Sequence, residues 1–281
     1  VYAQGVGDTV AAAIGESLPP EEFDGLYWSE VEAPRFKKSG RRYTRGWGKK
    51  IFKASSKQQY IEVMHDDRRN ATTLFLDRAL QLTDVGEHMY HELMAHVPLQ
   101  TLASPPKDVL IIGAGDGGVA LRVLMHPSVQ RVVQVELDGQ VVNTSKRFFP
   151  TIARAFSDPR MDLRIEDAID WATQEAADSP NAFDACIIDS TDNPLVSIWS
   201  AEFYAALRRM IRPGGVLMQN IAGFEEADHI RNMLRLRREG GWQRTRAVVM
   251  ATIDYEHPYI GFLSSGLDTP CPGPAPDAEA R

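Results

Sequence analysis

From Lys107 onward the chain alternates short apolar runs with amphipathic segments. The run at 109–112 is wholly apolar, and Asp184 is the one polar residue in the run at 183–188. Continuous apolar strands are typical of parallel sheets, because helices cover both faces of such sheets. The repeated order of strand and helix therefore predicts an α/β domain built on a parallel sheet. We expect the last two strands, over 245–253 and 259–264, to run antiparallel.

The residues before this region have a different pattern. Runs rich in β-formers at 60–64 and 73–76 are separated by the turn residues Asp66, Asp67 and Asn70. This pattern predicts a small antiparallel β-domain over 27–83. We expect an N-terminal extension over 1–26, a Rossmann-like domain over 84–265 and a mobile, proline-rich tail over 266–281.

The second predicted domain opens with a helix. We expect it to begin at Asp84, with Pro98 and the pair Pro105-Pro106 closing the segment. Met89, Leu93 and Val97 recur at every fourth position and predict its apolar face. Tyr90 and His91 are then expected beside that face.

Composition and charge exclude several classes of protein. With 43% hydrophobic residues the chain is not disordered, and a net charge of −7 argues against nucleic-acid or anionic-membrane partners. Cys186 and Cys271 form neither a disulfide framework nor a zinc motif, so we expect no metal. No apolar run approaches the ~18 residues of a membrane helix, and no signal peptide is visible, so we expect a cytoplasmic protein.

The first apolar strand is followed by the glycine-rich turn GAGDGG, residues 113–118. Gly113 and Gly115 permit a sharp turn and let the backbone come close to a ligand. Glu136 ends the next strand, 23 residues after Gly113, near the ~20-residue offset of an acid that binds ribose hydroxyls. A tight turn without a ligand is the alternative, but the position between strand and helix favours a nucleoside site.

Asp116 distinguishes between possible ligands of this turn. A dinucleotide would bring a pyrophosphate that the carboxylate repels, whereas a cationic group would be attracted. The turn therefore favours a sulfonium nucleoside with an ammonium tail over NAD. Asp167 follows the third strand, where it can cap the next helix, accept a hydrogen bond from an adenine amino group, or do both.

Two more acids, Asp189 and Asp192, follow the fourth strand. Ligands of open α/β sheets bind beyond the carboxyl ends of the strands. Acids at that edge attract a cation, and an aspartate beside an amine can take the proton that prevents the amine from attacking an electrophile. The alternative is a helix cap followed by a solvated turn.

These residues and their surroundings resemble the spermidine synthase family of aminopropyltransferases. The resemblance covers about residues 56–264 and is carried by SKQQYIEV, LFLDRALQLT, EHMYHELMAHVPL, VLIIGAGDGGVALRVLMHPSV, VVQVELD, IIDSTD and the closing IGF. It implies a methyltransferase-like Rossmann domain with a small N-terminal antiparallel β-domain, in homodimers or homotetramers. It also implies that decarboxylated S-adenosylmethionine, a co-substrate and not a cofactor, donates its aminopropyl group to a small cationic amine, putrescine by default, and leaves methylthioadenosine.

The same resemblance implies roles for individual residues. Asp189 would orient and deprotonate the acceptor amine, helped by the Tyr90 hydroxyl. The implied nucleoside contacts are Gln59, Asp116 at the donor ammonium, Glu136 at the ribose and Asp167 at the adenine. Gln81 and Asp192 would line the acceptor side, and Gln219 matches a family glutamine. The alternatives are a half-buried helix aromatic for Tyr90 and ordinary strand polar residues for Gln59 and Gln81.

Most departures from the family pattern fall on the acceptor side. Residues 193–197 lack the glycine of the family lid, and residues 254–258 replace a Tyr-Pro-Ser-Gly loop. Gly86 replaces an aspartate, and Arg78 replaces a glycine of the β-domain. We infer that the donor chemistry is retained while the acceptor has shifted, with Tyr255 or His257 in contact with it. A longer polyamine or an unusual amine is then an alternative to putrescine.

Two other functions remain open from the sequence. Some S-adenosylmethionine-dependent amine N-methyltransferases closely resemble this family, although the carboxylate of that donor would lie near Asp116. The other is a non-catalytic nucleoside- or polyamine-binding homologue, which only the altered lid supports. Asp189 and Tyr90 are both present and favour an enzyme.

Overall fold

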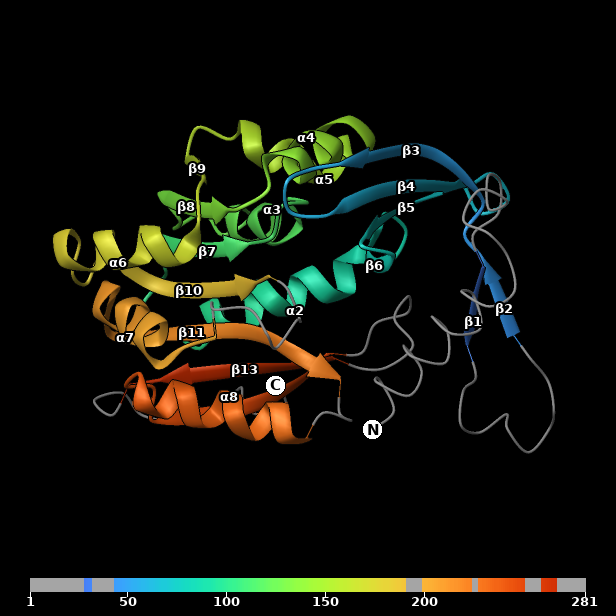
Figure 1. The fold of residues 1–281 in the computed structure, drawn as a ribbon. Helices are drawn as coiled ribbons and strands as arrows, with labels where there is room; N and C mark the ends of the chain where they lie inside the picture. Colours follow the sequence, from blue (N-terminus) through green and yellow to red (C-terminus); the bar gives the residue numbers. More distant parts are fainter. Residues whose placement is uncertain (1–27, 32–42, 191–198, 224–226, 251–258, 267–281) are drawn as a thin grey trace, which may run out of the picture. The chain divides into compact units, whose positions relative to one another are not determined.

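The computed structural model describes residues 28–31, 43–190, 199–223, 227–250 and 259–266 (Figure 1). The chain divides into two units, the first of which runs to Glu87, while the second begins at His88. The predicted N-terminal extension lies outside the described residues, as does the predicted tail beyond Gly266.

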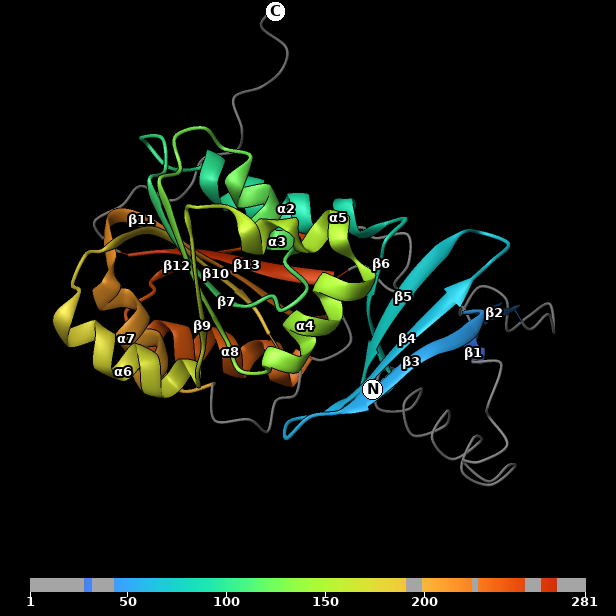
Figure 2. The same ribbon diagram turned by 90° about the horizontal axis from the view of Figure 1, so that it is seen from above.

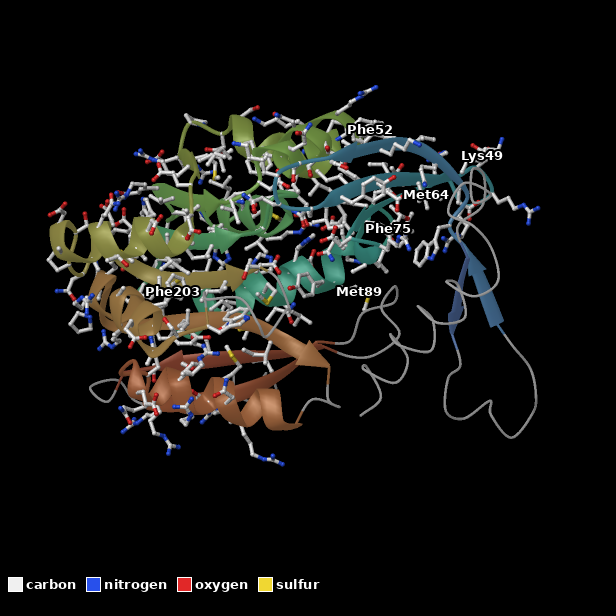
Figure 3. All side chains as sticks on the ribbon, in the orientation of Figure 1. Lys49, Phe52, Met64, Phe75, Met89 and Phe203 are labelled. Carbon is white, nitrogen blue, oxygen red and sulfur yellow. The ribbon has the colours of Figure 1, made fainter. Side chains whose placement is uncertain are left out.

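The first unit consists of antiparallel strands, as its runs of β-formers predict. β1 (Trp28–Val31) pairs with β2 (Tyr43–Gly46). A four-stranded meander follows, formed by β3 (Lys49–Ser55), β4 (Tyr60–Asp66), β5 (Ala71–Leu76) and β6 (Ala79–Thr83). On the meander Met64 and Phe75, both labelled in Figure 3, pack with Trp47 and Leu80.

The second unit holds a seven-stranded sheet in the order β12-β13-β11-β10-β7-β8-β9. Its strands are β7 (Asp108–Gly113), β8 (Arg131–Glu136), β9 (Met161–Ile165), β10 (Phe183–Asp189), β11 (Ile211–Gly223), β12 (Arg244–Met250) and β13 (Tyr259–Ser265). The strands from β7 to β11 are parallel, and β13 is antiparallel to both of its neighbours, as expected. The strand order reverses between β7 and β10, which is the point where open α/β sheets bind ligands.

Helices cover both faces of this sheet, and Figure 2 shows α6, α7 and α8 on one side with α2 and α3 on the other. The helices are α2 (Glu87–Gln100), α3 (Gly118–Leu124), α4 (Gly139–Phe148), α5 (Pro150–Ala153), the 3₁₀ turn η3 (Arg154–Ser157), α6 (Ala168–Asp178), α7 (Ala201–Met210) and α8 (Ala227–Glu239). Along β7, Leu110 and Ile112 join one apolar core, whereas Val109 and Ile111 join the other. The continuous apolar sequence of β7 is therefore explained, because both faces of this strand are buried. None of the described helices combines the length and the hydropathy that a membrane crossing needs.

Helix α2 differs from its prediction in two ways. It begins at Glu87, because Asp84 lies in a turn where its carboxylate accepts the Thr72 amide at 2.9 Å, and it continues through Pro98 to Gln100. Its fully buried side chains include Tyr90 and His91, whereas Met89, Leu93 and Val97 are only partly buried. The buried face is therefore rotated toward Tyr90, because α2 packs directly on the core that includes Val109 and Ile111.

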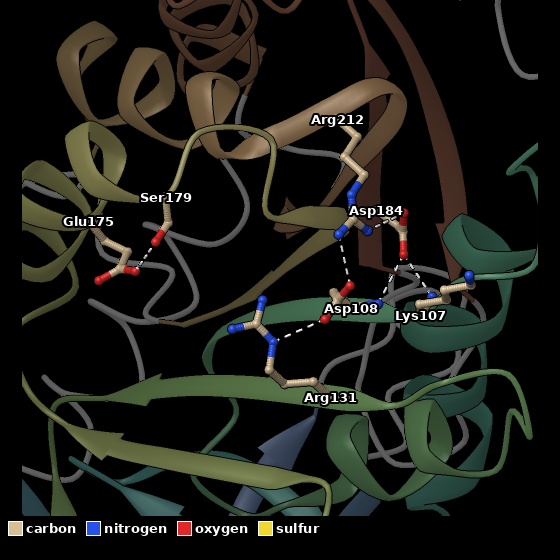
Figure 4. A network of polar contacts seen from close by, with 7 residues as sticks. All are labelled: Lys107, Asp108, Arg131, Glu175, Ser179, Asp184 and Arg212. Atoms are coloured by element: carbon tan, nitrogen blue, oxygen red, sulfur yellow. Dashed lines mark hydrogen bonds and ion pairs between the residues drawn. The ribbon is translucent and has the colours of Figure 1, made fainter.

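A network of ion pairs and hydrogen bonds lies at the amino-terminal ends of the parallel strands (Figure 4). Arg212 donates to Asp184 at 2.6 Å and to Asp108 at 2.8 Å. Asp184 also accepts the backbone amides of Lys107 and Asp108, and Arg131 reaches Asp108 at 3.0 Å. These contacts tie together the starts of β7, β8, β10 and β11, at the edge opposite the carboxyl ends of the strands.

The turn between β5 and β6 provides a test of local strain. Asp77 and Arg78 form its two-residue loop, and both have a positive φ, 49° and 69°. A side chain at such a φ costs about 1 kcal/mol, which glycine avoids at some cost in chain entropy. We expect Arg78→Gly to stabilise the protein by about 0.5–1 kcal/mol, measured by urea unfolding. Arg78→Ala is the control, since it keeps the Cβ atom and should give no gain; an equal gain from both variants would contradict the strain argument.

Candidate active site

The glycine-rich turn lies at the switch point and is bound to the end of β10. Gly113, Ala114 and Gly117 all have a positive φ, of 81°, 57° and 87°. The Ala114 amide donates to the carbonyl oxygen of Asp189 at 2.7 Å. A Cβ atom on Gly113 would lie 2.2 Å from that same oxygen, so the close approach requires glycine there.

Asp116, within the turn, is held from two sides. Its Oδ1 accepts the Gly118 amide at 2.6 Å, and its Oδ2 lies 3.5 Å from Nε2 of His91. Burial by itself would raise the pKa of Asp116, but His91 and the Gly118 amide outweigh that effect, and the pKa lies below its usual value. The Asp116 side chain is 12% exposed, so this charge is accessible to a ligand.

His91 is a site residue that the sequence did not single out. Its side chain is 2% exposed, and its ring fills the space where a Cβ atom on Gly118 would otherwise lie, 2.2 Å away. Its ring also contacts that of Tyr90 edge-on, at 5.4 Å between centroids. The position after Tyr90 in a helix was visible in the sequence, but the pairing with Asp116 was not.

Glu136 ends β8 and faces the turn. Its Oε1 accepts the Asp138 amide at 2.8 Å, and its Oε2 would lie 2.9 Å from a Cβ atom on Gly115. Gly115 therefore leaves room for the carboxyl group of Glu136. Burial raises the pKa of Glu136 to about 7; the Asp138 amide opposes this effect, while the charges of Asp138, Asp116 and Asp189 add to it.

Asp189 ends β10 and receives a hydrogen bond from another element. The hydroxyl of Tyr90, on α2, donates to Oδ1 of Asp189 at 2.5 Å, which joins residues 99 positions apart. Burial, followed by the charge of Asp116, raises the pKa of Asp189 to about 6, although His91 and Tyr90 lower it in part. A carboxyl group with such a pKa is ionised at neutral pH and can still accept a proton from a bound acid.

Asp167 lies at the same edge of the sheet, after β9. It is the N-cap of α6, and its Oδ1 accepts the Ile169 amide at 2.8 Å while the side chain remains exposed. Two apolar side chains are also exposed at this edge, Leu137 after β8 (47%) and Ile165 at the end of β9 (48%). An acceptor beside exposed apolar surface is suited to a flat, polar-edged ring.

The other predicted site residues belong to the first unit, lie outside the described residues, or are buried within the sheet. Gln59 and Gln81 belong to the first unit, where Gln59 closes a turn with Ser56 and Gln81 reaches the Ala79 carbonyl oxygen at 3.5 Å. Asp192 and Tyr255 lie outside the described residues, as does His257. Gln219 is fully buried on β11, where its Oε1 accepts the hydroxyl of Tyr204 at 2.8 Å. The roles implied for these residues therefore stay predictions.

The site is formed by five side chains. Three are the carboxyl groups of Asp116, Glu136 and Asp189, and the others are the Tyr90 hydroxyl and the His91 imidazole. Such a site attracts cations and can remove a proton from one of them. Within the described residues, no cluster of three or more His, Cys, Asp or Glu side chains is arranged to hold a metal ion.

Comparison with known proteins relates the chain to one family. Residues 87–267 match the family model described as "Spermine/spermidine synthase domain". A polyamine aminopropyltransferase from Thermoanaerobacter sp. (strain X514) is 41% identical over 162 residues, 57% of this chain and 56% of that relative. A spermine synthase from Arabidopsis thaliana is 39% identical over 172 residues, 60% of this chain and 46% of that relative. The chain thus spans about half the length of these relatives.

A solved structure has a similar fold. The crystal structure of spermidine synthase from Thermotoga maritima matches with a TM-score of 0.74 and 26% identity, over 86% of this chain and 80% of that one. This similarity confirms the predicted methyltransferase-like Rossmann domain with a small N-terminal antiparallel β-domain.

The raised pKa of Glu136 predicts how stability varies with pH. The folded protein binds this proton more tightly than the unfolded chain, so the carboxyl group favours folding at low pH and that advantage is lost between about pH 4.5 and 7. We expect Glu136→Gln to raise the free energy of unfolding at pH 8 by up to about 3 kcal/mol and to leave it unchanged at pH 4. Denaturant unfolding at both pH values measures this difference.

Glu166→Gln, an exposed neighbour beyond β9, is the matched control and should change stability at neither pH. A gain from Glu136→Gln that is equal at pH 4 and pH 8 would show that packing, and not charge, is responsible.

Proposed function

Because the chain belongs to the spermine/spermidine synthase family, we propose that it transfers the aminopropyl group of decarboxylated S-adenosylmethionine to an amine and releases methylthioadenosine. The observation that carries this proposal is the hydrogen bond between Tyr90 and Asp189 beside the glycine-rich turn. This hydrogen bond orients a proton acceptor, Asp189, next to a turn that is suited to a cationic nucleoside. The donor is a co-substrate, and the proposal includes no cofactor.

The donor would bind along the rim formed by β7, β8 and β9. Glu136 would accept hydrogen bonds from the ribose hydroxyls, while Gly113 and Gly115 let the turn approach the sugar. The exposed Leu137 and Ile165 would cover the faces of the adenine, and Asp167 would accept its amino group.

Asp116 would bind the ammonium group of the donor. His91 holds one of its oxygens and the Gly118 amide holds the other, so the carboxylate is already oriented. The carboxylated donor would bring a negative charge toward the same acid, which disfavours it. Asp116 therefore supports an aminopropyl donor over a methyl donor.

The transfer step needs alignment and the removal of one proton. The acceptor nitrogen attacks the methylene carbon next to the sulfonium sulfur, a carbon–nitrogen bond forms, and the carbon–sulfur bond breaks with its electron pair going to sulfur. The proton that leaves the nitrogen goes to Asp189, whose position the Tyr90 hydroxyl fixes.

For the acceptor we propose a small cationic amine, with putrescine as the first candidate and a longer polyamine as the alternative. The sequence departures over 193–197 and 254–258 support a shift in acceptor preference. Gln81, Asp192 and Tyr255 are the residues that we expect on that side. We further propose that the protein is a cytoplasmic homodimer or homotetramer without nucleic-acid or membrane partners.

Incubation with decarboxylated S-adenosylmethionine and a panel of amines tests the function. Chromatography should detect methylthioadenosine with at least one diamine or polyamine, in amounts equal to the aminopropylated product. S-adenosylhomocysteine formed from the carboxylated donor would instead identify an N-methyltransferase. Nucleoside binding without either product would identify a non-catalytic homologue.

Replacing Asp189 tests the proton acceptor. We expect Asp189→Asn to lower kcat by about 10²–10⁴-fold, because an amide cannot take the proton, while the Kd for methylthioadenosine changes little. In the wild type, kcat/KM should fall as the pH drops below about 6, where Asp189 becomes protonated.

Asp178→Asn makes the same change at an exposed position of α6 and should leave kcat near the wild-type value. If Asp189→Asn weakened nucleoside binding as much as turnover, Asp189 would be a structural residue of the turn.

A further inference from the structure

Gln134 lies behind the glycine-rich turn and takes no part in the site described above. It is on β8 and is fully buried. Its side-chain Nε2 donates two hydrogen bonds, to the carbonyl oxygens of Gly113 and Ala114, each 2.8 Å long. A single amide group thus holds two consecutive peptide units of the turn.

The chemistry of the amide determines its orientation. The opposite orientation would place Oε1 against two carbonyl oxygens, which repel it, so Nε2 must face the turn. Two successive carbonyl groups point toward one amide because Gly113 and Ala114 are both left-handed, at φ 81° and 57°. A left-handed backbone is strained for alanine, which has a Cβ atom. The hydrogen bond from Gln134 helps to hold Ala114 in this conformation.

The turn that Gln134 holds is linked through the backbone to Asp116, Glu136 and Asp189, the three carboxyl groups of the site. The Ala114 amide donates to the Asp189 carbonyl oxygen, and the Ala114 carbonyl oxygen also accepts the Gly117 amide at 2.9 Å, which folds the turn around Asp116. Glu136 follows Gln134 by two residues on the same strand, so both side chains point to the same face of the sheet.

We propose that Gln134 is a positioning residue, whose amide fixes the turn so that Asp116, Glu136 and Asp189 keep the spacing that aminopropyl transfer requires. This role rests on the proposed function. Gln134 would touch neither substrate and would act only through the backbone of residues 113 and 114.

Filling of the core alone does not explain a glutamine at this place. The Oε1 atom of Gln134 is buried and has no hydrogen-bond partner among the described residues, which is unfavourable. Methionine has a similar volume and would avoid that cost. The two donated hydrogen bonds are what methionine cannot supply.

The test compares Gln134→Met with Gln174→Met, the same change at an exposed position of α6. For Gln134→Met we expect a fall in kcat of about 10–100-fold, since small misplacements of reacting groups have large effects, with the Kd for methylthioadenosine within about fivefold of the wild type. Amide hydrogen exchange should show loss of protection of about tenfold or more at Ala114 and Gly117, with α6 unchanged. Gln174→Met should change none of these quantities.

Gln134→Glu keeps the shape of the side chain and is the second variant. Only its protonated form can donate, and to one carbonyl oxygen, so the protection of the Ala114 amide should recover as the pH is lowered. The proposal is overturned if Gln134→Met keeps kcat and the Ala114 protection near wild type, or if protection falls equally throughout the second unit. If the wild type transfers no aminopropyl group, the proposed function fails, and hydrogen exchange alone decides whether Gln134 holds the turn.

Discussion

The hydrogen bond from the Ala114 amide to the Asp189 carbonyl oxygen, 2.7 Å long, is the constraint on which the whole site depends. It joins the ends of β7 and β10, which are neighbours in the sheet although two other strands lie between them in the chain. Only glycine fits at 113, because any side chain would meet the same oxygen. In the proposed function, the nucleoside half of the site and the proton acceptor would therefore share one short piece of backbone.

Ionisation of the carboxyl groups gathered at this backbone is unfavourable. Burial and mutual repulsion raise the pKa of Glu136 and of Asp189, and each group is only partly compensated by a neighbour such as the Asp138 amide or the Tyr90 hydroxyl. A bound cation would relieve that repulsion and would favour the ionised forms. The same charges thus lower the stability of the protein and, in the proposed function, would favour positively charged ligands.

The two halves of the proposed reaction depend on different kinds of structure. Donor recognition would rest on strand ends and on the first turns of helices, which pack on the cores on both faces of the sheet. In the sequence, the acceptor-side candidates Asp192 and Tyr255 lie between runs predicted as strands and helices, and it is there that the sequence departs from the family pattern. Connecting segments vary more readily than the elements they join. This difference between the two halves of the site favours a change of acceptor amine while the donor stays the same.

The order of strands and helices, the glycine-rich turn and the acids at the strand ends could all be predicted from the sequence, because each depends on residues close together in the chain. The hydrogen bond between Tyr90 and Asp189 could not, since these residues are 99 positions apart, and the apolar residues of α2 indicated a different buried face. The contacts of His91 with Asp116 and of Gln134 with the turn likewise exist only once α2 and β8 pack beside β7. Local patterns determine which element a side chain belongs to; packing determines what it touches and how far its pKa moves, because burial and charge proximity arise only in the folded chain.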